Sequence, residues 1–181
     1  MREKALFLKN FLRNPLRNAS VIPSSKASSR AMLKGIDFNQ VSVVVELGPG
    51  NGVFTQEIIK NVPADTKIIV FEIEPTYVHL LQNKFGDRVT LVSKGAHLLS
   101  ETLEELGVDK VDVIISGLPF LKGEIKQKTD EAIYQLTKQG AIYRFFTYMP
   151  GIMKNVYKGL PIEKKYFEFR NIPPLWVYGI N

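Results

Sequence analysis

The chain has 181 residues, of which 45% are hydrophobic and 23% are charged, and it contains no cysteine and only two histidines. This composition excludes a disordered chain, a disulfide scaffold, a cysteine nucleophile and a metal centre built from histidines. No apolar run is long enough to span a membrane, and lysine and arginine interrupt the N-terminal apolar residues as they would not in a secretory signal. We therefore expect a cytoplasmic protein without a metal site.

The positive charge is concentrated at the N-terminus. Residues 1–34 carry eight basic side chains and one acidic side chain, whereas the other 147 residues carry 16 basic and 17 acidic side chains. Helical spacing gives the first part of this segment an apolar face and a basic face, made of Leu8, Phe11, Leu12 and Leu16 and of Lys9, Arg13 and Arg17, respectively. We predict a basic amphipathic arm over 1–34 and a main domain over 35–181. The arm either binds an anionic surface or packs its apolar face on the domain.

Strands and helices alternate along the rest of the chain. The pattern predicts helices over 25–34, 54–61, 77–85, 98–106 and 129–139, and strands over 41–46, 67–72, 89–92, 111–116 and 141–148. Segments 166–170 and 175–178 are typical of a terminal antiparallel hairpin. This order predicts a three-layer α/β fold around a mainly parallel sheet.

A glycine-rich turn follows the first predicted strand. It reads Glu46-Leu47-Gly48-Pro49-Gly50-Asn51-Gly52, and Glu72 ends the second strand twenty residues later. The glycines allow a ligand to approach the backbone, and an acid at the end of the second strand can accept hydrogen bonds from ribose hydroxyls. The spacing differs from the G-x-G-x-x-G of dinucleotide sites, and the acid before the first glycine suits the cationic methionine end of S-adenosylmethionine. The alternative is a glycine turn in another kind of α/β protein.

The turn resembles the first motif of the class I methyltransferases, which have a Rossmann-like fold. Within that superfamily, the ribosomal RNA adenine dimethyltransferases are similar over the first hundred residues but carry Asn-Leu-Pro-Tyr at the end of the fourth strand. This chain has Ser116-Gly117-Leu118-Pro119-Phe120 there, so Gly117 cannot supply the side-chain acceptor that holds an adenine amino group. The sequence also ends at residue 181, before the helical RNA-binding domain that those enzymes append. Both differences argue against RNA as the substrate.

The chain resembles the short bacterial phospholipid N-methyltransferases over nearly its whole length. The resemblance rests on Phe11–Leu16 with Pro23-Ser24-Ser25, the Glu46–Thr55 loop, Ser116–Pro119, Phe146-Thr147-Tyr148 and Asn171–Pro174 with Trp176. It implies stepwise transfer of methyl groups from S-adenosylmethionine to phosphatidylethanolamine, towards phosphatidylcholine. It also implies that the enzyme associates peripherally with the inner face of the cytoplasmic membrane through Lys9, Phe11, Leu12, Arg13 and Arg17. No nucleic-acid partner and no obligate protein partner are expected.

The same resemblance implies the roles of the site residues. The expected cofactor contacts are Glu46, Gly48, Gly50, Gly52, Glu72, Ile73, Gly95, Ala96 and Ser116. The expected substrate contacts are Gly117, Leu118, Pro119, Phe120 and Tyr148, with Tyr148 and Ser116 as the catalytic candidates; the aromatic rings of Phe120 and Tyr148 would hold the methylated ammonium. Many relatives have an acid after the third strand, but this chain has Ser93-Lys94-Gly95-Ala96-His97, so the Gly95–Ala96 backbone would contact the adenine. An RNA adenine-N6 methyltransferase and a non-catalytic binding module remain the alternatives.

Overall fold

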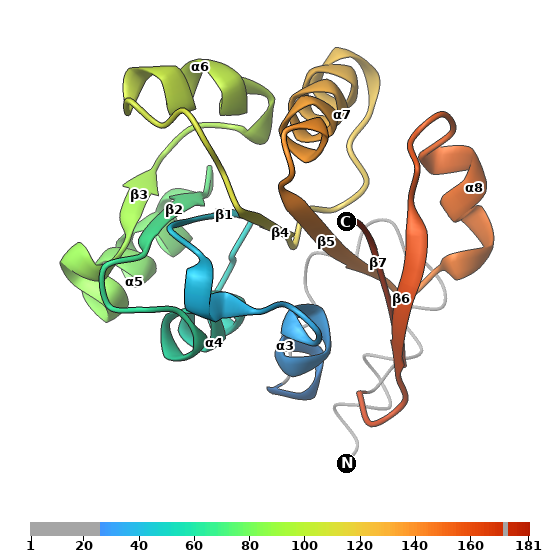
Figure 1. The fold of residues 1–181 in the computed structure, drawn as a ribbon, viewed down its shortest axis with the longest axis horizontal. Coiled ribbons are helices and arrows are strands. Elements are labelled where there is room, and N and C mark those ends of the chain that lie inside the picture. The colour runs from blue at the N-terminus through green and yellow to red at the C-terminus, as the bar shows by residue number, and fades with distance from the viewer. Residues whose placement is uncertain (1–25, 172–173) are drawn as a thin grey trace.

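A single seven-stranded sheet in the order β3-β2-β1-β4-β5-β7-β6 forms the centre of the computed structural model, which describes residues 26–171 and 174–181 (Figure 1). The strands are β1 Val43–Leu47, β2 Lys67–Phe71, β3 Thr90–Val92, β4 Val113–Ser116, β5 Ile142–Thr147, β6 Glu163–Glu168 and β7 Leu175–Ile180. The pairs among β1 to β5 are parallel, whereas β7 pairs antiparallel with both β5 and β6. The predicted Rossmann-like α/β fold with an antiparallel C-terminal hairpin is confirmed.

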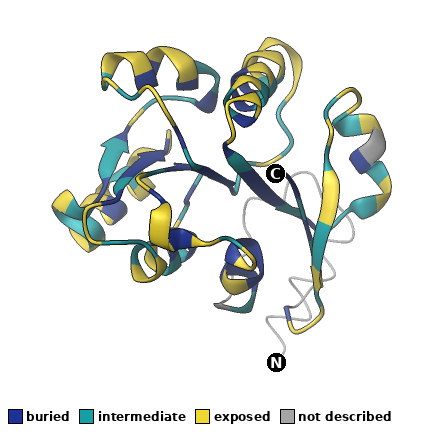
Figure 2. Ribbon diagram, viewed as in Figure 1, coloured by how far each residue is buried: buried dark blue, intermediate teal, exposed yellow. Residues whose placement is uncertain are grey.

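Helices cover both faces of the sheet and make it the middle of three layers (Figure 1). One face is covered by α3 Lys26–Leu33, α4 Val53–Asn61 and α5 Pro75–Phe85, and the other by α6 Leu99–Glu105, α7 Gly123–Lys138 and α8 Met153–Val156. The central strands β1 and β4 are therefore buried on both sides, which explains why their sequences are almost wholly apolar (Figure 2). Short 3-10 turns at Phe38–Gln40, Gly86–Arg88, Ala96–Leu98 and Pro150–Ile152 connect the layers.

The last part of the predicted arm belongs to this packed fold. Helix α3 buries Ala31, Met32 and Leu33 against the sheet, while Arg30 and the residue just after the helix, Lys34, are exposed. The Lys34 ammonium lies 5.0 Å from the ring centre of Tyr166 on β6. Residues 1–25 lie outside the described residues, and with them all five residues that we predicted to bind the membrane. Among the described helices, none is long and apolar enough to cross a membrane.

Helix α7 begins six residues before the start that the sequence predicts. Its first turns are polar, and two ion pairs at i, i+4 spacing support them: Lys126 with Asp130, and Lys128 with Glu124 at 3.0 Å. No side chain caps its N-terminus, so the usual start signal is missing from the sequence. The short helix α8 was also not predicted, because four residues carry too little periodicity to recognise.

Candidate functional site

The carboxyl ends of β1, β2 and β4 meet at one edge of the sheet. The Gly48 N–H donates to the Phe71 carbonyl at 2.9 Å, and the Gly117 N–H donates to the Leu47 carbonyl at 2.8 Å. These bonds continue the ladders of the parallel strands past the last paired residues. The glycine turn, Glu72 and the Ser116–Phe120 loop are thereby brought together, as the fold predicts for a ligand site.

Glu72 holds the glycine turn in place. One carboxylate oxygen accepts the Gly50 N–H at 3.1 Å, and the other accepts the N–H groups of Ile73 at 2.8 Å and Glu74 at 2.9 Å. A carboxylate offers about four acceptor positions, so one remains for a ligand hydroxyl. The side chain of Ile73 is 70% exposed beside it and offers an apolar surface at the edge.

The glycine turn leaves open space in front of its backbone. Gly48, Gly50 and Gly52 all have positive φ angles, which only glycine adopts without strain. Among the described residues, no atom lies within 4 Å of a Cβ atom built on Gly50. The backbone at Gly50 is therefore open to a ligand, and the N-terminus of α4 follows it directly.

Glu46 is a completely buried acid behind this turn. Burial raises its pKa to about 8, and the Thr55 hydroxyl and backbone N–H oppose the rise only in part. Neither carboxylate oxygen makes a hydrogen bond of good geometry with any residue that the structure describes. A buried acid in this condition favours a cationic ligand, because a nearby positive charge stabilises the ionised carboxylate.

The Ser116–Phe120 loop approaches the glycine turn so closely that residue 117 has no room for a side chain. A Cβ atom built on Gly117 would lie 2.6 Å from the Gly48 carbonyl oxygen, which is a backbone atom that cannot move alone. An asparagine at this position would require the two loops to separate. The Ser116 hydroxyl accepts the Leu118 N–H at 3.4 Å and so stabilises the bend of the loop.

The segment after β3 lies beside Glu72, because the Glu72 N–H donates to the Val92 carbonyl at 3.1 Å. Ala96 is buried, and the ring of His97 packs over Gly95, where a Cβ atom would lie 2.6 Å from it. Lys94 forms an ion pair with Glu105 on α6. The predicted contact between the Gly95–Ala96 backbone and an adenine stays a prediction.

Tyr148 and Phe120 come to the same edge from opposite faces of the sheet. Tyr148 packs with the cluster beneath α3 and α4, where its ring lies 5.5 Å from that of Phe146. Phe120 packs with the cluster on the side of α6 and α7. Burial raises the pKa of Tyr148 to about 12, opposed by a hydrogen bond with Asn171, so the phenol is neutral at physiological pH. A shared cage of the two rings stays a prediction.

Comparison with known proteins identifies the family. The chain is 31% identical over 183 residues to the ornithine lipid N-methyltransferase of Singulisphaera acidiphila, a match that covers 98% of this chain and 95% of that protein. The chain belongs to the lipid N-methyltransferase-like family of class I methyltransferases. S-Adenosylmethionine is the methyl donor of this class, as predicted. No model of a protein family matches the chain.

Two further proteins are similar to this chain. The ribosomal RNA small subunit methyltransferase A of Mycoplasma mycoides is 30% identical over 148 residues, which are 75% of this chain and 52% of that protein. The structure of Aeropyrum pernix fibrillarin with natively bound S-adenosyl-L-methionine superposes with a TM-score of 0.62 at 18% identity, over 90% of this chain and 76% of that one. At that identity the superposition supports the fold alone.

The residues at the edge suit S-adenosylmethionine. The buried Glu46 carboxylate lacks a partner of good geometry, which matches a ligand with an ammonium group. Glu72 retains one acceptor position for a ribose hydroxyl, and the open backbone at Gly50 leaves room for the ligand between them. These three residues would hold the cofactor of the methyltransferase.

One group of residues near this edge was not predicted from the sequence. Lys126 and Asp130 of α7 and Tyr157 after α8 line a pocket with Ser116 and the loop that follows it. The only signal in the sequence is the i, i+4 spacing of Lys126 and Asp130, which is also typical of solvent-exposed ion pairs.

Replacing Gly50 tests the cofactor site. We expect Gly50→Ala to abolish binding of S-adenosylhomocysteine in calorimetry, because the new methyl group enters the space that the ligand needs. Gly107→Ala is the matched control, since Gly107 also has a positive φ (61° against 56°) and open space around it but lies in the loop after α6. Both variants should lose about 1–2 kcal/mol of stability from the same backbone strain. Equal cofactor affinity in the two variants would contradict the assignment.

The raised pKa of Glu46 predicts how pH affects binding and stability. A cationic ligand needs the ionised carboxylate. Because the pKa of Glu46 is about 8, Glu46 must lose a proton when the cofactor binds below that pH. The affinity should therefore fall about tenfold for each unit by which the pH is lowered. Without ligand, the stability of the fold depends on pH in the opposite direction. The folded pKa lies above the unfolded value of 4.5, so stability should fall as pH rises from 4.5 to 8. Calorimetry in two buffers and thermal melts measure the two effects, and both should disappear in Glu46→Gln.

Proposed function

We propose that this methyltransferase transfers methyl groups to the primary amine of a membrane-lipid head group, with phosphatidylethanolamine as the substrate. The observation that carries the proposal is the near full-length similarity to an enzyme named for lipid N-methylation. The head group of ornithine lipid also presents a primary amine, so it is the second substrate to test.

The loop geometry supports a lipid amine over an RNA adenine. An adenine amino group needs an acceptor side chain at position 117, and the Gly48 carbonyl leaves no space for one. An alkylamine has a localised lone pair and needs less help: a straight approach to the methyl group and loss of its own proton to solvent. S-Adenosylmethionine, when bound, supplies the electrophilic methyl group, and Ser116 and the residues after it orient the amine.

Exposed aromatic side chains support approach to a membrane at this edge. Phe167 is 48% exposed and lies 4.8 Å from the ring of Trp176, which is paired with Thr147 at the carboxyl end of β5. Phe169, just beyond β6, is 67% exposed, and the Arg170 guanidinium lies 5.6 Å from its ring. Aromatic and cationic side chains of this kind favour the interface between lipid and water.

A methyl-transfer assay tests the proposal. The protein with radiolabelled cofactor is offered vesicles with phosphatidylethanolamine, vesicles with ornithine lipid, and small-subunit ribosomal RNA. We expect label in phosphatidylethanolamine and none in RNA. Label in ornithine lipid alone would identify ornithine lipid as the substrate, and label in RNA alone would overturn the proposal.

Reversing the charge of the arm tests membrane association. Each basic residue near an anionic surface contributes about 1 kcal/mol, so changing Lys9, Arg13 and Arg17 together to Glu should abolish co-sedimentation with phosphatidylglycerol vesicles. Cofactor affinity should not change. The control changes Lys60, Lys110 and Lys138 to Glu; these are exposed lysines at the amino edge of the sheet, and the change in net charge is the same. Equal loss of sedimentation in both variants would show that net charge matters and the arm does not.

A further inference from the structure

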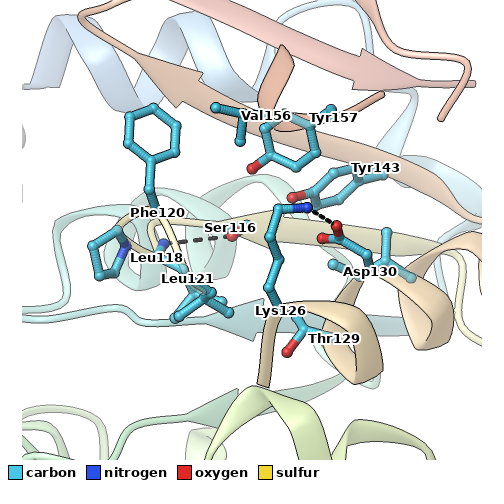
Figure 3. Close-up of a pocket in the computed structure, with 12 residues that line it drawn as sticks. Ser116, Leu118, Phe120, Leu121, Lys126, Thr129, Asp130, Tyr143, Val156 and Tyr157 are labelled. Carbon is cyan, nitrogen blue, oxygen red and sulfur yellow. Dashed lines mark hydrogen bonds and ion pairs between the residues drawn. The ribbon is translucent and has the colours of Figure 1, made fainter. Parts of the chain in front are cut away.

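A small pocket opens beside Ser116 on the face of the sheet that α7 and α8 cover (Figure 3). It is lined by the loop 118–121, by the first turns of α7, by Tyr143 of β5, and by Val156 and Tyr157. It shares Ser116 and Phe120 with the predicted cofactor and substrate contacts. The pocket therefore adjoins the place where a substrate amine must meet the methyl group.

An alkylammonium group already occupies this pocket. The Lys126 ammonium forms an ion pair with Asp130 and lies 5.1 Å from the centre of the Tyr157 ring (Figure 3). A carboxylate and an aromatic face are the two protein groups that bind alkylammonium ions most favourably. The pocket thus provides such surroundings for a group of the same chemistry as the substrate amine.

The position of this ion pair distinguishes it from its neighbour on the same helix. The side chains of Lys126 and Asp130 are 25% and 21% exposed, whereas those of Lys128 and Glu124 are 54% and 76% exposed. Solvent screens the second pair, but the first is partly enclosed by tyrosines. Its partial desolvation strengthens the attraction of Asp130 for any ammonium group in the pocket.

The tyrosine wall packs against another aromatic ring and is neutral. The Tyr157 ring lies 4.7 Å from Phe145, which also stacks on Tyr143 at 5.4 Å. Burial raises the pKa of both tyrosines, so their phenols keep their protons and Asp130 is the only anion among the residues that line the pocket. Without the Lys126 ammonium the pocket would have a net charge of −1 and would attract a cation.

The pocket has no spare room for a second cation. Its free space holds about one water molecule. We propose that the substrate ammonium binds here in place of the Lys126 ammonium, with Asp130 as its counter-charge and the Tyr157 ring as its aromatic wall; this inference rests on the proposed function. The bound ammonium must still lose its proton to solvent before its nitrogen can accept a methyl group.

Kinetics with matched variants test the site. Asp130→Asn should raise the apparent KM for the lipid amine at least about tenfold with unchanged cofactor affinity, because the counter-charge is lost. Glu124→Gln removes the exposed acid from the same helix and should change neither value. Lys126→Met should lower the apparent KM by about threefold, because it removes a competing ammonium. Vesicles of phosphatidylethanolamine and of ornithine lipid are assayed separately to distinguish the two amines.

Cation binding separates this inference from the proposed function. Tetramethylammonium chloride is titrated into the full chain loaded with S-adenosylhomocysteine, and amide shifts are followed by NMR. We expect shifts around Asp130 and Tyr157 that Asp130→Asn abolishes and Glu124→Gln retains. Such shifts without methylation of any lipid would reject the proposed function and leave the cation site standing. Shifts around Tyr148 instead, or equal behaviour of the two variants, would overturn the inference.

Discussion

The carboxylate of Glu72 organises the carboxyl edge of the sheet. By accepting N–H groups from Gly50, Ile73 and Glu74, it joins the end of β2 to the turn after β1. The position of this turn limits how closely the Ser116–Phe120 loop can approach it, because Gly48 and Gly117 are in contact. One buried acid thereby sets the positions of the groups that we expect to meet cofactor and substrate.

The second acid, Glu46, differs from Glu72 in its hydrogen bonding. Glu72 is satisfied by backbone donors, whereas Glu46 is buried with a pKa of about 8. Acids with a pKa raised this far cluster at the functional sites of proteins. The two acids thus have different roles: Glu72 holds the backbone of the site together, and Glu46 is available to a cationic ligand.

The exclusion of a side chain at position 117 connects this geometry to substrate choice. Sequence comparison alone indicates that an acceptor is missing there. The contact with the Gly48 carbonyl shows in addition that a single substitution cannot restore the acceptor, because residue 117 has no room for a side chain. Specificity for an alkylamine would then be carried by charge and aromatic surface, which the pocket around Asp130 and Tyr157 offers.

The sequence by itself determined the order of strands and helices, the glycine turn and the two acids at strand ends, because hydrophobic periodicity and glycine spacing are local signals. It could not place the start of α7, whose first turns depend on ion pairs and lack a cap. It also could not show that Phe120 and Tyr148 approach from opposite faces, since each follows a strand end and only the packing of the helices assigns it to a layer. The pair Lys126–Asp130 has the spacing of an ordinary surface ion pair, and only the tertiary structure decided that it faces Tyr157 in a pocket, because the contact joins segments about thirty residues apart.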